Sequence, residues 1–206
     1  PLMEIFLRHT ERQALHAALM QEPDALIVTS RHAVQALALL TSSRDPFLLC
    51  VGPATAQAAE SLGFARTADC GGNVESLIQY INAGYDEDSR FLYLSGAQVR
   101  AELDDILSAY RMRVQRLVLY DAVAATQLSD TLVEQFRRGQ VDAATFLSPR
   151  TAQIFAQLLA KAQVQPATEG MAAFCLSDAV TTPLGKLAWK SVHVAREATL
   201  ASLMEC

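Results

Sequence analysis

The chain has 206 residues, of which 51% are hydrophobic and 19% are charged, and its formal net charge is -5. A chain of this length and apolar content can fold as one large domain or as two small ones. Its apolar runs fall short of the roughly 18 residues that indicate a membrane span, and its acidic balance argues against a nucleic-acid partner. An anionic small molecule can still bind, because local N–H groups and a few arginines attract it whatever the net charge. No segment has the layout of a signal peptide, so we expect a cytoplasmic protein with neither a membrane nor a nucleic-acid partner.

Apolar strands alternate with amphipathic helices along the whole chain. The helices with the clearest limits are expected at residues 31–40, at 99–110, from Ser129 to Arg138 and through Leu187. In chain order, the expected strands are residues 1–8, 26–29, 47–51, 65–69, 91–94, 114–123, 172–176 and 192–195, with a further strand at the start of residues 142–158. This alternation is typical of an α/β fold with parallel sheets flanked by helices.

The four cysteines, Cys50, Cys70, Cys175 and Cys206, are far apart and form no C-x-x-C motif. Cys50 and Cys175 fall inside expected strands, where a free cysteine behaves as a small apolar residue. We therefore expect reduced cysteines with a structural role.

Residues 24–40 and residues 142–158 are two copies of one pattern. Aligned without a gap, the copies share an opening Asp-Ala, a serine at Ser30 and Ser148, and a glutamine at Gln35 and Gln153. Each copy predicts a short strand, a small polar residue at its carboxyl end, and an amphipathic helix. The correspondence continues from residues 50–54 to residues 175–179, so the sequence predicts two similar domains.

The two halves are unequal. The first half also contains residues 90–123, which predict a strand, a helix and a long second strand, and nothing after residue 195 corresponds to them. If the domains are built alike, the missing strand and helix should precede residue 1, and we expect that the chain lacks them; a naturally shorter second domain is the alternative. We expect a monomer, or a swapped dimer if a strand is missing and leaves a sheet edge free.

A chain that begins in one domain, crosses into another and returns needs two linking strands. Residues 1–8 and 117–126 are the expected linkers, and they can pair antiparallel as a two-stranded hinge. Residues 9–116 then form domain 2, a complete α/β unit, and residues 127–206 form domain 1, which is incomplete.

No cofactor or metal motif is present. The sequence contains neither a phosphate-binding G-x-x-x-x-G-K-[ST] loop nor a G-x-G-x-x-G turn after a strand. The four histidines, His9, His16, His32 and His193, have no spacing typical of metal ligands. We therefore expect no cofactor and no metal.

Small polar residues gather where the expected strands pass into helices. For any single position, capping of the helix is the favoured interpretation. As a set, with two arginines one short turn into their helices, they suit an elongated ligand that carries several carboxylates. The candidate substrate-binding residues are Thr29, Ser30, Thr55, Ser95, Gly96, Arg100, Ser148, Arg150 and Ser177. Tyr120 is a phenol in an otherwise apolar strand near the domain crossing, where it can face a ligand or serve as a packing anchor.

At these residues the chain resembles uroporphyrinogen-III synthases. No single motif is diagnostic; the order of all of them carries the resemblance. The matching segments are IVTSRHAV (residues 27–34), VGPATA (51–56), SG-x-x-x-R (95–100), VLYDAV (118–123) and FLSPRTA (146–152).

The resemblance implies two α/β domains joined by a two-stranded ladder, with the active site in the cleft between them. It implies a lyase that needs no cofactor and cyclises the linear tetrapyrrole hydroxymethylbilane, with its last ring inverted, to uroporphyrinogen III. Tyr120 matches the family tyrosine proposed to assist departure of the terminal hydroxyl as a general acid. Ser30, Thr55, Ser95, Arg100 and Ser148 match positions in the family's cleft.

The chain departs from the family pattern at three places. His32 stands where the family has an arginine, and it joins the candidate substrate-binding residues. Ser177 and Asp178 replace a Gly-Pro pair, which puts a carboxylate near an anionic ligand. The family's opening strand is absent, so we expect little or no activity, which robust turnover of hydroxymethylbilane would contradict.

Two other interpretations stay open at this point. Two-lobed α/β proteins that bind or sense small ligands also exchange their chain through hinge strands. A degenerate synthase-like domain kept for interactions is the third interpretation, favoured if Ser177 and Asp178 block the cleft.

Overall fold

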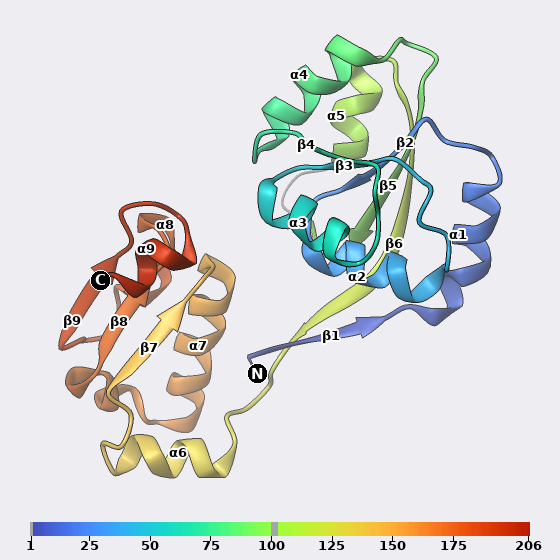
Figure 1. Ribbon diagram of the computed structural model, residues 1–206. Coiled ribbons are helices and arrows are strands. Elements are labelled where there is room, and N and C mark those ends of the chain that lie inside the picture. The colour runs from blue at the N-terminus through green and yellow to red at the C-terminus, as the bar shows by residue number, and fades with distance from the viewer. Residues whose placement is uncertain (1, 100–102) are drawn as a thin grey trace. The chain divides into compact units, whose positions relative to one another are not determined.

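The computed structural model describes residues 2–99 and 103–206 and divides the chain into two compact units. Unit 2 is Ile5–Val123, and unit 1 combines the first residues, up to Glu4, with Ala124–Cys206. The chain passes between the units within β1 (Met3–Leu7) and at the end of β6 (Arg113–Ala124). Both sheets contain parallel strands with helices beside them, so the expected α/β fold is confirmed (Figure 1).

The larger sheet has the strand order β1-β6-β5-β2-β3-β4. Its other strands are β2 (Ala25–Val28), β3 (Leu48–Cys50), β4 (Thr67–Asp69) and β5 (Arg90–Gly96). From β4 to β6 all neighbours pair in parallel. β1 pairs antiparallel with β6. At one end Arg8 N–H donates to Leu119 O, and at the other Ala125 N–H donates to Leu2 O, so later residues of the first strand pair with earlier residues of the second.

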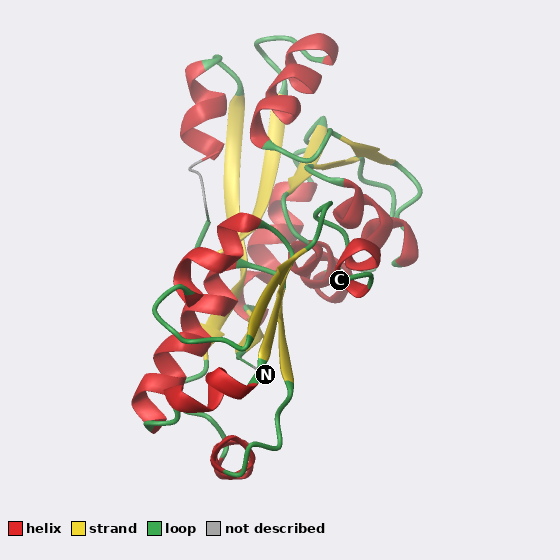
Figure 2. Ribbon diagram, turned by 90° about the vertical axis from the view of Figure 1, so that its left-hand side faces the viewer, coloured by secondary structure: helices red, strands yellow, loops and turns green. Residues whose placement is uncertain are grey.

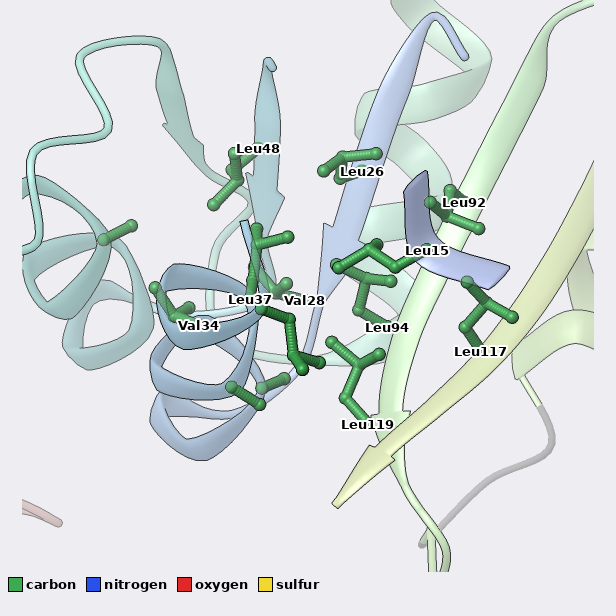
Figure 3. Packing of buried hydrophobic residues seen from close by; sticks show 14 of the residues in the cluster. Leu15, Leu26, Val28, Val34, Leu37, Leu48, Leu92, Leu94, Leu117 and Leu119 are labelled. Carbon is green, nitrogen blue, oxygen red and sulfur yellow. The ribbon is translucent and has the colours of Figure 1, made fainter. Parts of the chain in front are cut away.

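Helices cover both faces of this sheet, and the two faces carry separate apolar clusters. Alternate residues of β2 point to opposite faces: Leu26 and Val28 belong to one cluster, Ala25 and Ile27 to the other. The first cluster includes Val34 and Leu37 of α2 and Leu15 of α1 (Figure 3). Such strands are apolar on both faces, as is typical of parallel sheets. The helices are α1 (Arg12–Leu19), α2 (Arg31–Leu40), α3 (Pro53–Ser61), α4 (Val74–Gly84) and α5 (Leu103–Ala109).

Unit 1 contains a smaller sheet of β7 (Ala143–Phe146), β8 (Ala172–Cys175) and β9 (Ser191–Val194), all parallel in that order. Figure 2 shows these strands flanked by helices. Its core gathers Phe146, Phe155 and Trp189. The helices are α6 (Asp130–Arg137), α7 (Pro149–Ala162), α8 (Asp178–Thr181) and α9 (Leu200–Met204).

The repeat seen in the sequence is also a structural repeat. Ser30 before α2 and Ser148 before α7 have nearly the same backbone angles, and each side chain accepts a hydrogen bond from the N–H three residues on. The surroundings differ, because β2 pairs with both β3 and β5, whereas β7 pairs with β8 alone among the described strands.

Two expected helices differ from the structure. The helix expected at residues 99–110 begins at Leu103 in the described part of the chain. The helix expected through Leu187 is one turn of α8 followed by a 3-10 turn at Thr182–Leu184, because Pro183 cannot donate the backbone hydrogen bond that an α-helix requires. Of the helices over residues 2–99 and 103–206, none is long and apolar enough to cross a membrane.

Candidate functional site

The carboxyl ends of β2, β3 and β5 meet at one edge of the larger sheet, because these strands are parallel. At this edge unit 2 has a cavity of about 700 Å³, which we call the carboxyl-edge cavity. Ligands of open α/β sheets bind at this edge, where helix N-termini present free N–H groups. The residues that line it are Thr29, Ser30, Val51, Gly72, Asn73, Val74, Glu75, Tyr93, Gly96, Gln98, Val99, Leu103, Ile106 and Tyr120.

Tyr120 reaches the cavity because of an irregularity in the strand pairing. β5 and β6 pair residue for residue up to Ser95 and Val118, but Gly96 pairs with Tyr120, so Leu119 is an extra residue. A bulge of this kind bends the strand and redirects the side chains that follow it. The Tyr120 side chain is 8% exposed, and its Oη lies 2.9 Å from Ser30 Oγ.

Ser30 occupies the first position before α2. Its Oγ accepts a hydrogen bond of 3.1 Å from Ala33 N–H, which caps the helix. The same Oγ shares a hydrogen bond with the Tyr120 hydroxyl, so the phenol is tied to the positive end of α2.

The other described candidates of unit 2 do not line the cavity. Ser95 is 1% exposed, and its Oγ accepts a 2.9 Å hydrogen bond from Arg116 Nε. Thr55 is buried within α3. His32 is exposed at the start of α2, where its ring meets the edge of the Tyr120 ring at a centroid distance of 5.9 Å. Arg100 lies outside the described residues.

Three candidates belong to unit 1. The Ser148 hydroxyl caps α7 by accepting from Thr151 N–H, and it also bonds the Thr151 hydroxyl. Arg150 is half-buried in the first turn of the same helix. Ser177 stands before α8 without a side-chain cap, and Asp178 places a carboxylate in the first turn of that helix.

Four residues near the cavity escaped the sequence analysis. Gly72, Asn73 and Gln98 line it. Arg116 donates hydrogen bonds to Ser95 Oγ and to the backbone oxygen of Gly96, which is a lining residue. Gly72 and Asn73 follow β4, a parallel strand, so their place at a strand end was a usable signal. Arg116 carried no such signal, because an arginine within a strand is ordinary in sequence.

The polar groups that line the cavity are mainly hydrogen-bond donors. In the part of the chain that the structure describes, no group of three or more His, Cys, Asp or Glu side chains could hold a metal ion. The described lining includes one carboxylate, that of Glu75 in the first turn of α4. The other polar groups are buried phenols, hydroxyls, side-chain amides and the N–H groups of helix N-termini. These groups bind anions and donate protons.

The sequence and the fold were compared with known proteins. A family model described as uroporphyrinogen-III synthase HemD matches residues 1–205. No curated protein matches the sequence. The crystal structure of uroporphyrinogen-III synthetase from Helicobacter pylori is similar with a TM-score of 0.65 at 16% identity, over 99% of this chain and 88% of that one. A mutant uroporphyrinogen III synthase from Thermus thermophilus is similar with a TM-score of 0.56 at 19% identity, over 100% of this chain and 85% of that one.

These two structures carry the same two-domain α/β fold, and the family model spans nearly the whole chain. The chain therefore belongs to the uroporphyrinogen-III synthase family, the lyases that cyclise hydroxymethylbilane to uroporphyrinogen III in tetrapyrrole biosynthesis.

Proposed function

We propose that hydroxymethylbilane binds at the carboxyl-edge cavity and that Tyr120 is the catalytic acid of its cyclisation. The observation that carries this proposal is the place of the phenol. Tyr120 is nearly buried, yet its side chain lines the cavity at the end of three parallel strands. A phenol is protonated at neutral pH and can therefore donate.

In the proposed step, the C–O bond of the terminal hydroxymethyl group breaks and the Tyr120 proton passes to the leaving oxygen. Water departs with the electron pair of that bond, while the lone pair of the terminal pyrrole nitrogen stabilises the resulting cation. The later ring closure releases a proton, which can restore the phenol. The remaining task, favouring closure with the last ring inverted, is one of positioning and electrostatics.

The substrate carries several carboxylates, and we propose that helix N-termini bind some of them. Thr29 and Ser30 precede α2, and Gly72 and Asn73 precede α4, all on the cavity wall. Gly52 precedes α3 and provides no side-chain cap. Pro53 has no N–H and the Thr55 N–H donates to Gly52 O, so Ala54 has the N–H that a ligand oxygen can bind at this helix. The family resemblance adds Arg100, Thr55, Ser95 and His32, and it adds Ser148, Arg150 and Ser177 from unit 1.

We further propose that the protein acts in the cytoplasm as a monomer, with residues 1–8 and 117–126 as the links between its domains. The net charge of -5 is consistent with the absence of nucleic-acid partners. Sedimentation velocity measures the oligomeric state, and a stable dimer at micromolar concentration would contradict a monomer.

The test of the catalytic role, made in the full-length protein, is Tyr120→Phe, which removes the proton donor and keeps the ring. We expect kcat to fall by about 100-fold with KM changed by less than about threefold, because a general acid acts on the transition state. Tyr110→Phe is the matched control, since Tyr110 is also in unit 2 but is 49% exposed and away from the cavity. Formation of uroporphyrinogen III is measured chromatographically beside the uninverted isomer. An unchanged kcat in Tyr120→Phe would refute the proposed role.

A further inference from the structure

Gly96 is a glycine for reasons of space. Its φ is not among the positive values seen at Gly63, Gly71, Gly72 and Gly139, so its backbone does not itself require glycine. A Cβ at this position would lie 2.7 Å from Tyr120 Cζ and 3.0 Å from Tyr120 Oη, well inside van der Waals contact. The reactive end of the phenol therefore rests on the α carbon of Gly96.

Ser30 holds the same hydroxyl from another direction. A serine hydroxyl has one hydrogen and two lone pairs. One lone pair of Ser30 accepts from Ala33 N–H, at 3.1 Å, so its hydrogen remains available for Tyr120 Oη at 2.9 Å. If Ser30 donates, the phenolic hydrogen is directed elsewhere, and the cavity that Tyr120 lines is open to it.

We propose that Gly96 and Ser30 are positioning residues that act through Tyr120: Gly96 leaves the space for its hydroxyl, and Ser30 donates a hydrogen bond to it, so that the phenolic proton points into the cavity. This inference rests on the proposed catalytic role of Tyr120. It assigns to Gly96 and Ser30 a task other than direct substrate binding. The negative charge that develops on the phenolic oxygen as the proton leaves is met by the Ser30 hydrogen bond and by the positive end of α2.

The bulge and Arg116 complete the arrangement. Without the bulge, residue-for-residue pairing would place Leu119 opposite Gly96, and the phenol would not lie there. Arg116 donates to Ser95 Oγ at 2.9 Å and to Gly96 O at 3.3 Å, and these hydrogen bonds hold the end of β5, where Gly96 contacts Tyr120.

Substitutions of Ser30 test the direction of the hydrogen bond. Aspartate is as good a helix cap as serine, but its carboxylate can only accept, so in Ser30→Asp the phenol must donate to it and turn its proton away from the cavity. We expect kcat of Ser30→Asp to fall at least about tenfold, and Ser30→Thr, which caps and donates, to stay within about threefold. KM should rise in Ser30→Asp, because its carboxylate lies where substrate carboxylates are proposed to bind, and it should change little in Ser30→Thr; kcat is therefore compared at saturating substrate. Ser129→Ala, which removes the equivalent cap of α6, controls for the loss of a cap and should leave kcat unchanged.

Substitution of Gly96 tests the space. In Gly96→Ala the ring must retreat by about 1 Å, and we expect kcat to fall by about 100-fold. When Gly96→Ala is added to Tyr120→Phe, we expect kcat to fall less than about threefold below that of Tyr120→Phe alone. The reason is that Gly96 acts by positioning the phenolic hydroxyl, which Tyr120→Phe has already removed. Gly84→Ala is the control, since a Cβ at Gly84 meets no atom within 4 Å.

A second measurement does not depend on turnover. With 3-fluorotyrosine placed at position 120, the ¹⁹F resonance reports the surroundings of the phenol. We expect Ser30→Asp and Gly96→Ala to shift it, and Ser30→Thr and Gly84→Ala to leave it in place. Circular dichroism confirms folding of each variant.

The outcomes separate the two proposals. If Tyr120→Phe keeps its kcat, the proposed role of Tyr120 fails. If Tyr120→Phe loses activity while Ser30→Asp and Gly96→Ala keep both kcat and the ¹⁹F resonance, only the positioning role is overturned. An equal loss from Gly96→Ala with and without the phenol would mean that Gly96 contacts the substrate itself.

Discussion

Three of the four cysteines lie in the apolar interior, and burial makes their thiols hard to ionise. Burial raises the pKa of Cys50 to about 12 and that of Cys70 to about 11, and the nearby Asp69 carboxylate adds to both shifts. Burial also raises the pKa of Cys175. Only the thiolate reacts with disulfide reagents. At neutral pH these three thiols are therefore unreactive for two reasons: the reagent cannot reach them, and they stay protonated. Cys206 is exposed.

We predict that a disulfide reagent at pH 8 modifies one thiol quickly in the native protein, and the other three only on unfolding. The fast reaction belongs to Cys206, so Cys206→Ser should abolish it, while Cys175→Ser should leave it unchanged. Titration with Ellman's reagent, with and without urea, measures both quantities. Rapid modification of a second thiol in native protein would show that a buried cysteine is accessible.

For individual residues, the sequence was enough to predict which polar side chains belong to the candidate site, but not which of them form hydrogen bonds with one another. Thr29, Ser30, Gly96 and Tyr120 were all candidates, and all four line the cavity. The hydrogen bond between Ser30 and Tyr120 joins residues 90 positions apart, and no local pattern encodes it. Thr55 and Ser95 are buried and do not line the cavity, and no local pattern distinguishes a small polar residue of that kind from one on the cavity wall.

Among the elements, the pairing of β1 with β6 is secured by an ion pair with two hydrogen bonds. Arg8 Nε lies 2.8 Å from Asp121 Oδ2, and Arg8 Nη2 lies 2.9 Å from Asp121 Oδ1. These hydrogen bonds, more than the charge attraction alone, hold the pKa of the Asp121 carboxyl below its usual value, and they raise the pKa of Arg8. A two-point contact of this geometry is stronger than a single surface ion pair.

The lowered pKa of Asp121 predicts how stability depends on pH. A carboxylate that binds protons less readily in the folded state stabilises the fold at pH values above its unfolded pKa of about 3.9. That contribution is lost as the pH falls through the lower, folded pKa. Asp121→Asn should therefore lower the urea midpoint at pH 7, and its difference from the unsubstituted chain should vanish toward pH 2.

The control for this measurement is Asp88→Asn. Asp88 pairs with Arg113 through side chains that are 87% and 68% exposed, and such pairs contribute little to stability. Its urea midpoint should match that of the unsubstituted chain from pH 7 to pH 2. If Asp121→Asn behaves in the same way, the Arg8–Asp121 pair does not stabilise the fold.

The elements themselves were predictable wherever local signals agreed. The helix expected at residues 31–40 has those limits in the structure, because a capping serine and an amphipathic pattern coincide there. Asn73 caps α4 in the same way. The bulge between β5 and β6 was not predictable, since a strand's sequence does not state its register against a neighbour 20 or more residues away.

At the scale of the whole molecule, the apolar clusters follow the two units. Two clusters cover the faces of the sheet in unit 2, a third lies in unit 1, and in the described part of the chain the three share no residue. The repeat in the sequence predicted two α/β units. It could not predict how the units are placed, because placement depends on contacts that no repeat contains.

The chain's single tryptophan distinguishes the two units during unfolding. Trp189 stacks on Phe155 in the core of unit 1, so its fluorescence reports that unit alone.

Leu40 and Leu158 are equivalent positions of the repeat, one in each unit, and both are 4% exposed. Replacing either with alanine should destabilise its own unit by about 3 kcal/mol. We predict that Leu158→Ala lowers the denaturant midpoint of the fluorescence transition. Leu40→Ala should leave that midpoint unchanged, and the part of the far-UV circular dichroism change that comes from unit 2 should occur at a lower denaturant concentration. Equal shifts of both probes in both variants would mean instead that the units unfold as one cooperative body.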